Sequence, residues 1–250
     1  MLARVIVLLG ALGAAAALTL VPLLAGGPLG PWWTSLAFVA VVAAVGYGWT
    51  RLLQVPVGWG VGWIVVGTGV TGAVLVQLDG TDDLEWVPAV FAVGVVVAFV
   101  HQMGRRDGRP RLVESVSASV SGQAVVLLGT GWLAADAGTG SVAPLLVGAT
   151  GCVSAALVMS VPWPRPVTLP LATVAGGLLA GALGGWVVEG TGVLPALALG
   201  AVSGATTAGL HVLLYRQPTT SHRRAAVSAG AACVMAAGLG VHVGARLTLG

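Results

Sequence analysis

The chain has 250 residues, of which 57% are hydrophobic and only 8% charged, and its formal net charge is +3. Its mean hydropathy is +0.98. Soluble domains carry about 25% charged residues, so this composition excludes an ordinary soluble domain and predicts a membrane protein. Because each crossing uses roughly 20 apolar residues, we expect residues 1–250 to form one integral membrane domain without a separate soluble domain.

Apolar runs of 18 or more residues alternate with short polar or Gly/Pro segments, a pattern typical of transmembrane helices. The first run follows Arg4 and resembles a signal peptide, but its length favours an uncleaved helix. The sequence therefore predicts an all-α, polytopic transmembrane helical bundle of about nine helices. Their expected ranges are 3–25, 33–50, 58–78, 86–103, 115–135, 142–161, 167–188, 192–215 and 224–245.

Arginine positions predict how these helices are oriented, because cytoplasmic loops retain Lys and Arg. With the N-terminus in the cytoplasm, only Arg246 lies outside. The expected inner arginines are Arg4, Arg51, Arg105, Arg106, Arg109, Arg111, Arg165, Arg216, Arg223 and Arg224. Most acids lie on the other side: Asp79, Asp82, Asp83, Glu85, Asp136 and Glu189 outside, against Asp107 and Glu114 inside.

This distribution predicts four in–out–in hairpins and a final helix, with the N-terminus cytoplasmic and the C-terminus outside. The arginines are accompanied by no lysine in a chain rich in Gly, Ala and Val. That bias indicates a bacterial origin with a high-GC genome, and hence a multi-pass protein of the cytoplasmic (inner) membrane.

The tryptophans are predicted to form interfacial belts, since indole prefers the headgroup layer. Those expected at outer helix ends are Trp32, Trp33, Trp86, Trp132 and Trp186, and those at inner ends are Trp49, Trp59, Trp63 and Trp163.

Glycines four residues apart indicate close contacts between helices. We expect such packing, within the chain in preference to a homodimer, at Gly177, Gly181, Gly185, Gly200 and Gly204.

The stretch HQMGRRDGRPR, between the fourth and fifth helices, has two interpretations. It is either a cytoplasmic loop that only sets orientation, or a site where guanidinium groups bind lipid phosphates, helped by donors at the end of the fourth helix. The residues of this hypothetical lipid-phosphate site are His101, Gln102, Arg105, Arg106, Arg109 and Arg111.

Two polar stripes recur at four-residue spacing, which places each stripe on one helix face. One interpretation is a polar vestibule on the cytoplasmic side. The other is ordinary bonding of Ser and Thr to backbone carbonyls or neighbouring helices. The stripes are Ser115, Ser119 and Gln123 in the fifth helix, and Ser203, Thr207, His211 and Tyr215 in the eighth.

Other chemistry finds little support in the sequence. No Asp, Glu or Arg lies deep within a predicted helix, which disfavours proton- or cation-coupled transport. Cys152 and Cys233 fall near mid-helix and are expected to be small packing residues. The few Cys and His residues have no metal-ligand spacing. We therefore expect neither a metal nor another cofactor, and no catalytic residue.

Three functions stay open at this point. The first is a small transporter or flippase-like protein for a lipid or weakly polar solute, and the second is an accessory or scaffold subunit of a membrane complex. The third, an enzyme acting on lipid phosphates at the cytoplasmic side, is disfavoured because the region VSGQAVVLLGTG, downstream of Asp107 and Gly108, contains no acid that could hold a metal, and serine hydrolase chemistry is disfavoured because no G-x-S-x-G motif is present. The expected partners are membrane lipids, including anionic headgroups, and membrane protein subunits, with no nucleic acid.

Overall fold

The computed structural model describes residues 2–25, 30–56, 58–79, 84–106, 108, 110–139, 141–161, 165–186 and 192–249. These residues form helices connected by short loops, and the described part contains no strand. The helices are α1 (Leu2–Ala25), α2 (Gly30–Leu52), α3 (Gly58–Asp79), α4 (Val87–Met103), α5 (Leu112–Leu128), α6 (Thr130–Thr139), α7 (Ala143–Ser160), α8 (Arg165–Trp186), α9 (Val193–Tyr215), η1 (Pro218–Ser221), α10 (Arg223–Ala236) and α11 (Gly238–Leu249).

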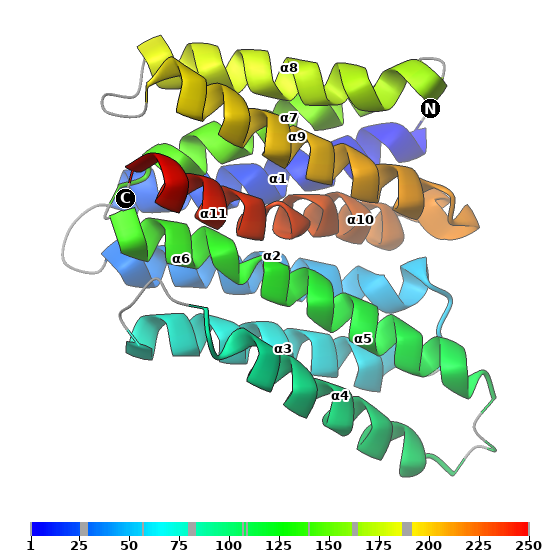
Figure 1. Cartoon of the computed structure of the whole chain (residues 1–250). Coiled ribbons are helices and arrows are strands. Elements are labelled where there is room, and N and C mark those ends of the chain that lie inside the picture. Colours follow the sequence, from blue (N-terminus) through cyan, green and yellow to red (C-terminus); the bar gives the residue numbers. More distant parts are fainter. Residues whose placement is uncertain are drawn as a thin grey trace.

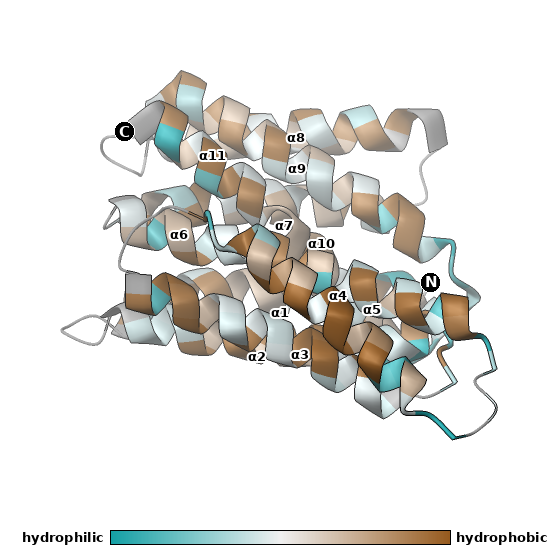
Figure 2. Cartoon of the chain, turned by 60° about the horizontal axis from the view of Figure 1, so that its bottom comes forward, coloured by the Kyte–Doolittle hydropathy of each residue, from teal (hydrophilic) through white to brown (hydrophobic). Residues whose placement is uncertain are grey.

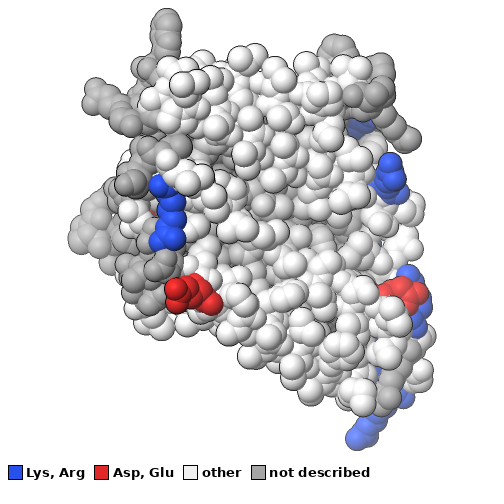
Figure 3. All heavy atoms as spheres, viewed as in Figure 1, with Lys and Arg blue, Asp and Glu red and all other residues white. Residues whose placement is uncertain are grey.

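The all-helical membrane architecture predicted from composition is confirmed. Seven helical segments within the described residues are long and apolar enough to cross a bilayer. Two further apolar helices are shorter, namely α4 and the Leu169–Ala182 part of α8. The count of nine crossings and their orientation therefore stay predictions. Figure 3 shows charged side chains at the two ends of the bundle, separated by a broad uncharged surface that suits lipid.

Two predicted helices are each divided into two. The expected 115–135 helix consists of α5 and α6, which meet at Gly129, and the expected 224–245 helix consists of α10 and α11, which meet at Ala237. The two junctions contact each other directly. A Cβ atom at Gly238 would lie 2.7 Å from the Leu128 carbonyl oxygen and 3.0 Å from Gly129 Cα. Only a residue without a side chain allows the two backbones to cross this closely.

The helix α10 lies at the centre of the bundle, packed against α1, α2, α5 and α9. Nearly every residue from Ala225 to Met235 is buried, and most are small. Small side chains on all sides let four neighbours approach one helix. Figure 1 shows the remaining helices arranged around it, with α8 at one edge and α4 at the opposite edge.

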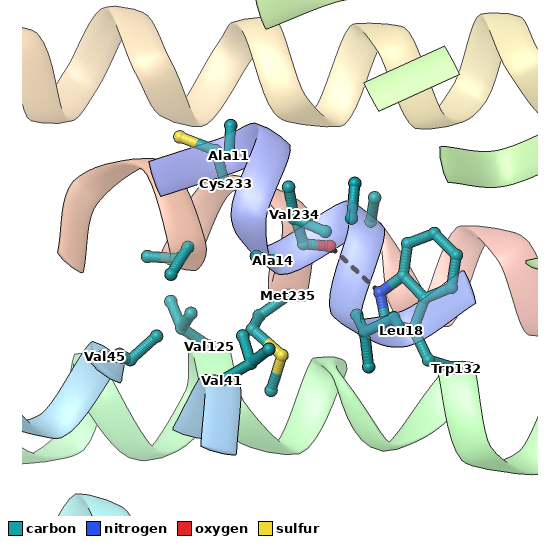
Figure 4. Close-up of a cluster of buried hydrophobic side chains, with 14 of the residues drawn as sticks. Ala11, Ala14, Leu18, Val41, Val45, Val125, Trp132, Cys233, Val234 and Met235 are labelled. Carbon is teal, nitrogen blue, oxygen red and sulfur yellow. Dashed lines mark hydrogen bonds between the residues drawn. The ribbon is translucent and has the colours of Figure 1, made fainter. Parts of the chain in front are cut away.

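Two tryptophans do not lie in the interfacial belts predicted for them. Trp132 is fully buried, and its indole N–H donates to the Val234 carbonyl oxygen at 3.0 Å (Figure 4). Trp49 is also buried and donates to the Ala118 carbonyl oxygen at 2.8 Å. Both rings pack helices together within the bundle. By contrast, Trp59 and Trp63 are exposed as expected of a belt.

Candidate functional site

The residues of the predicted phosphate-binding loop do not all come together. Arg106 is exposed, and Arg109 lies outside the described residues. Arg111 donates to the Gln54 carbonyl oxygen at 2.9 Å and lies 3.6 Å from a carboxylate oxygen of Glu114. Arg111 thus connects the α4–α5 loop to the loop between α2 and α3.

The other three residues of that set lie at the C-terminal end of α4, which is its predicted inner end. His101 and Gln102 belong to its last turn, and Arg105 follows the helix. The Arg105 guanidinium donates from Nη1 to Gln102 Oε1 at 2.6 Å. Because a guanidinium has no acceptor, this bond determines which end of the amide faces Arg105.

The opposite end of that amide has no partner. Gln102 is 1% exposed, and its Nε2, which carries two hydrogens, makes no hydrogen bond to any residue that the structure describes. The neighbouring His101 ring packs against Gly60 of α3, where there is no room for a Cβ atom, and its Nε2 is likewise buried without a partner. Two consecutive side chains therefore hold buried nitrogen atoms that bond to no described residue, and one of them, Gln102, bonds to Arg105 through its oxygen.

The stripe on α5 runs from the first turn of that helix into the bundle, and Ser115 donates to the Arg111 carbonyl oxygen at 2.9 Å. Ser115, Ser119 and Gln123 are fully buried. Gln123 donates from Nε2 to Ser119 Oγ at 3.1 Å, and its Oε1 accepts from Thr68 of α3 at 3.3 Å. At 1.5 Å per residue, Gln123 lies about 18 Å along the helix axis from Arg111. That distance brings the amide to about the middle of a 30 Å hydrocarbon layer.

The helix α4 covers this stripe with a narrow face of small residues. Its buried positions are Gly94, Ala98 and Gln102, one turn apart. A Cβ atom at Gly94 would overlap the Gln123 amide, so the glycine makes room for that side chain. We call the buried polar groups between α3, α4 and α5 the polar seam. Its members are Thr68, Gln102, Ser115, Ser119 and Gln123, the half-buried His101, and Arg105 just beyond the C-terminal end of α4.

On its other side, α4 faces outward. It packs mainly against α3 and α5, and its exposed residues include Val93, Val97 and Val100. Figure 2 shows this side of α4 as a largely hydrophobic surface. The polar seam is therefore separated from lipid by a single peripheral helix.

The second predicted stripe, on α9, lies elsewhere. Ser203 and Thr207 are buried and bond to backbone carbonyls, of Leu199 at 2.8 Å and of Cys233 at 3.5 Å respectively. His211 is buried and stacks on Tyr215, with ring centroids 5.6 Å apart. The neighbours of α9 are α7, α8, α10 and α11, whereas α5 lies on the other side of α10. The two stripes therefore do not form one vestibule.

A further polar group, which the sequence analysis did not single out, lies at the predicted outer end. Thr34 of α2 donates to an Asp136 carboxylate oxygen at 2.7 Å. The next residue, Ser35, accepts from Gln77 of α3 at 2.7 Å. Both α2 residues are buried, and the Trp86 indole nitrogen is buried without a partner. In the sequence, this polar group is indicated by the adjacent residues Thr34 and Ser35 in an otherwise apolar segment.

The predicted glycine packing joins α7, α8 and α9. Gly177 and Gly181 contact the Leu197 region of α9, and the surroundings of Gly185 lie outside the described residues. The closest crossing also uses two glycines that were not predicted: a Cβ atom at Gly176 would lie 2.8 Å from the Gly200 carbonyl oxygen, and one at Gly151 would lie 2.6 Å from it. Gly204 contacts the same crossing. Backbones meet here without intervening side chains.

Among the described residues, no three His, Cys, Asp or Glu side chains gather as a metal site, and Cys152 and Cys233 are buried free thiols. Comparison with protein families, with curated proteins and with solved structures gives no match to this chain. The function must therefore be argued from the polar seam itself.

Proposed function

We propose that this chain is a flippase-like transporter that moves a polar-headed lipid between leaflets of a bacterial cytoplasmic membrane along the polar seam. The observation that carries the proposal is the fully buried Gln123 amide at about mid-bilayer depth, which bonds to Ser119 on the α5 face that also carries Ser115. Polar groups at this depth are costly in hydrocarbon, and such residues commonly mark transport pathways.

The bonding of Gln123 favours a pathway over a purely structural role. A serine or threonine in a membrane helix satisfies itself on its own backbone, as Thr68 does on the Ile64 carbonyl oxygen. The longer Gln123 amide instead bonds to two neighbouring hydroxyl groups. A passing headgroup with hydroxyl groups, which both donate and accept, can replace these partners bond for bond.

The position of α4 supplies a route for the lipid tails. Two of the three buried residues on its seam-facing side, Gly94 and Ala98, are small, so little of α4 itself projects toward α5. Its opposite side is apolar. If α4 moves outward, the headgroup enters the seam while the acyl chains stay in the bilayer. This arrangement requires no wide aqueous channel.

Reconstitution tests the proposal. Purified protein in liposomes containing a fluorescent phospholipid is treated with an impermeant quencher, and the rate of transfer between leaflets is measured. We expect the wild type to accelerate transfer and Gln123→Leu, which replaces the amide by an apolar side chain of similar size, to reduce the rate toward that of protein-free liposomes.

Thr207→Val is the matched control, because it removes a buried hydroxyl from the α9 stripe and leaves the polar seam intact. It should retain wild-type transfer. Equal rates for wild-type and protein-free liposomes would refute lipid transport. Equal loss in Gln123→Leu and Thr207→Val would show that the seam has no special role.

A scaffold subunit is the second candidate, and the glycine crossing of α7, α8 and α9 favours it. Contacts such as Gly176 to Gly200 make this half of the bundle closely packed, as a fixed platform for another subunit requires. Purification in native membrane discs decides between the two: a stoichiometric partner protein supports the scaffold, and transfer by the isolated chain supports the transporter.

A further inference from the structure

We infer that the inner end of α4 binds a phosphoryl oxyanion, a phosphate monoester or diester, through Gln102 Nε2, His101 Nε2 and the Arg105 guanidinium. The claim that this phosphate belongs to a lipid rests on the proposed function. It deepens that function by naming the headgroup class that enters the polar seam.

The unsatisfied nitrogens are the first argument. Leaving a buried donor without an acceptor costs about 1–3 kcal/mol. In the hydrocarbon layer no water is present to accept the hydrogen bond, so the protein or a ligand must supply the acceptor. Arg105 occupies Gln102 Oε1, so the end of the amide that is left over can only donate. The missing partner of Gln102 is therefore an acceptor, and a group rich in oxygen atoms suits it.

Charge is the second argument. Arg105 and Arg106 follow the helix directly, and hydrogen bonds from cationic donors to oxyanions are about twice as strong as neutral ones. The carbonyl end of α4 opposes an anion. However, α5 begins nearby at Leu112, and its N-terminal amides offset that effect, although its first turn also contains the acidic Glu114. Arg106 adds a second positively charged side chain next to Arg105.

The number and direction of the donors distinguish phosphate from a carboxylate. Gln102 and Arg105 lie on the same side of the helix and are in contact. His101, the preceding residue, leaves the helix axis about 100° away from Gln102 and donates in the tautomer that carries its proton on Nε2. A tetrahedral phosphate presents three or four oxygens to separated donors. A planar carboxylate has only two oxygens, which a single guanidinium can occupy.

Both unsatisfied nitrogens are covered in this structure. Binding must therefore displace the inner end of α4 from α3 and α5, which are its main neighbours. The small Gly60 opposite His101 offers no side chain that would hold the ring in place. Headgroup binding and opening of the polar seam are thus expected to be one event.

Ligand-induced thermal stabilisation of the whole chain in detergent tests the site, since a ligand of the folded state raises its melting temperature. The probes are inorganic phosphate, a short-chain phosphatidic acid and a diacylglycerol with the same chains. We expect the phosphatidic acid to stabilise the protein and the diacylglycerol to have no effect. Stabilisation by inorganic phosphate as well would show that free phosphate suffices, whereas its absence would show that the lipid is required. Equal effects of both lipids would overturn the inference, and so would no effect of either phosphate probe.

The variants Gln102→Glu and Gln102→Leu test the amide directly. Glu keeps an oxygen for Arg105 but replaces the donor by an acceptor, and Leu removes both. Each should weaken binding about tenfold or more. The Leu variant should still fold, because removing the unsatisfied amide nitrogen offsets the loss of the bond from Arg105. If the Glu variant does not fold, the Leu variant alone tests whether the Gln102 amide binds the phosphate. Wild-type binding in either folded variant would overturn the inference.

Arg216→Gln is the matched control for charge, because Arg216 is an exposed arginine at the end of α9, away from the polar seam. This variant should bind the phosphatidic acid like the wild type. If its binding is weakened as much as that of Gln102→Glu, the weaker binding reflects the net charge of the protein and not the site. These equilibrium measurements are independent of lipid transfer. Binding without lipid transfer would support the phosphate site and refute the transporter function. Lipid transfer without binding would support the transporter function and refute the phosphate site.

Discussion

Replacing Trp132 by Phe tests whether the indole stabilises the crossing of the two helix junctions. The indole lies against Gly148 of α7, where a Cβ atom would approach within 3.2 Å of the ring, and against Gly238 of α11, where one would lie 2.7 Å from Cδ1. Its N–H donates to the Val234 carbonyl oxygen next to the α10–α11 junction (Figure 4). Phenylalanine keeps an aromatic ring but loses the donor and part of the volume.

The expected cost follows from these contacts. The Val234 carbonyl keeps one donor, the Ala237 amide at 3.2 Å, so losing the indole bond costs about 1 kcal/mol. The vacated space adds a cavity term of about 1 kcal/mol, since the site is fully buried and closely packed on both sides. The sum is about 2 kcal/mol, or roughly 4–8 °C in melting temperature for a chain of this size.

Thermal unfolding in detergent, followed by circular dichroism, measures this shift. Trp59→Phe is the control, because it is the same substitution at a residue that is 79% exposed. It should shift the melting temperature by less than about 1 °C. If Trp132→Phe is as stable as Trp59→Phe, the indole does not hold the junctions together and the reasoning is refuted.

The remaining predictions concern packing, orientation and the second stripe. Gly181→Leu should cost about 1–3 kcal/mol by overpacking in a thermal unfolding assay, whereas Gly209→Leu, where nothing lies within 4 Å of the added Cβ, should be tolerated; equal stability would contradict the packing. In a cysteine-free background, Gly108→Cys should react with an impermeant thiol reagent only from the cytoplasm and Glu85→Cys only from outside, and the reverse would refute the orientation. His211→Leu should leave lipid transfer unchanged, because α10 separates its stripe from the polar seam; a transfer rate as low as that of protein-free liposomes would place the pathway on α9 instead.

The membrane class and the approximate helix positions could be predicted from the sequence alone. Hydrophobic length is a local property, and a run of about 20 apolar residues has few alternatives to a helix in lipid. The junctions at Gly129 and Ala237 were not predicted, because neither segment contains a proline there and the interruption depends on two helices crossing. The same holds for Trp49 and Trp132, since a tryptophan near a helix end suits either an interface or a buried contact.

For the candidate site, the sequence determined which residues are polar and which helix face each shares, because four-residue spacing is a local regularity. It did not distinguish the α5 stripe from the α9 stripe. Only the tertiary structure decided that Ser203 bonds to its own helix whereas Gln123 bonds across to Thr68. It also decided that α4 covers one stripe and α10 separates it from the other. The physical reason is that a polar side chain in a membrane helix takes whichever partner its neighbours place within reach, and those neighbours are distant in sequence.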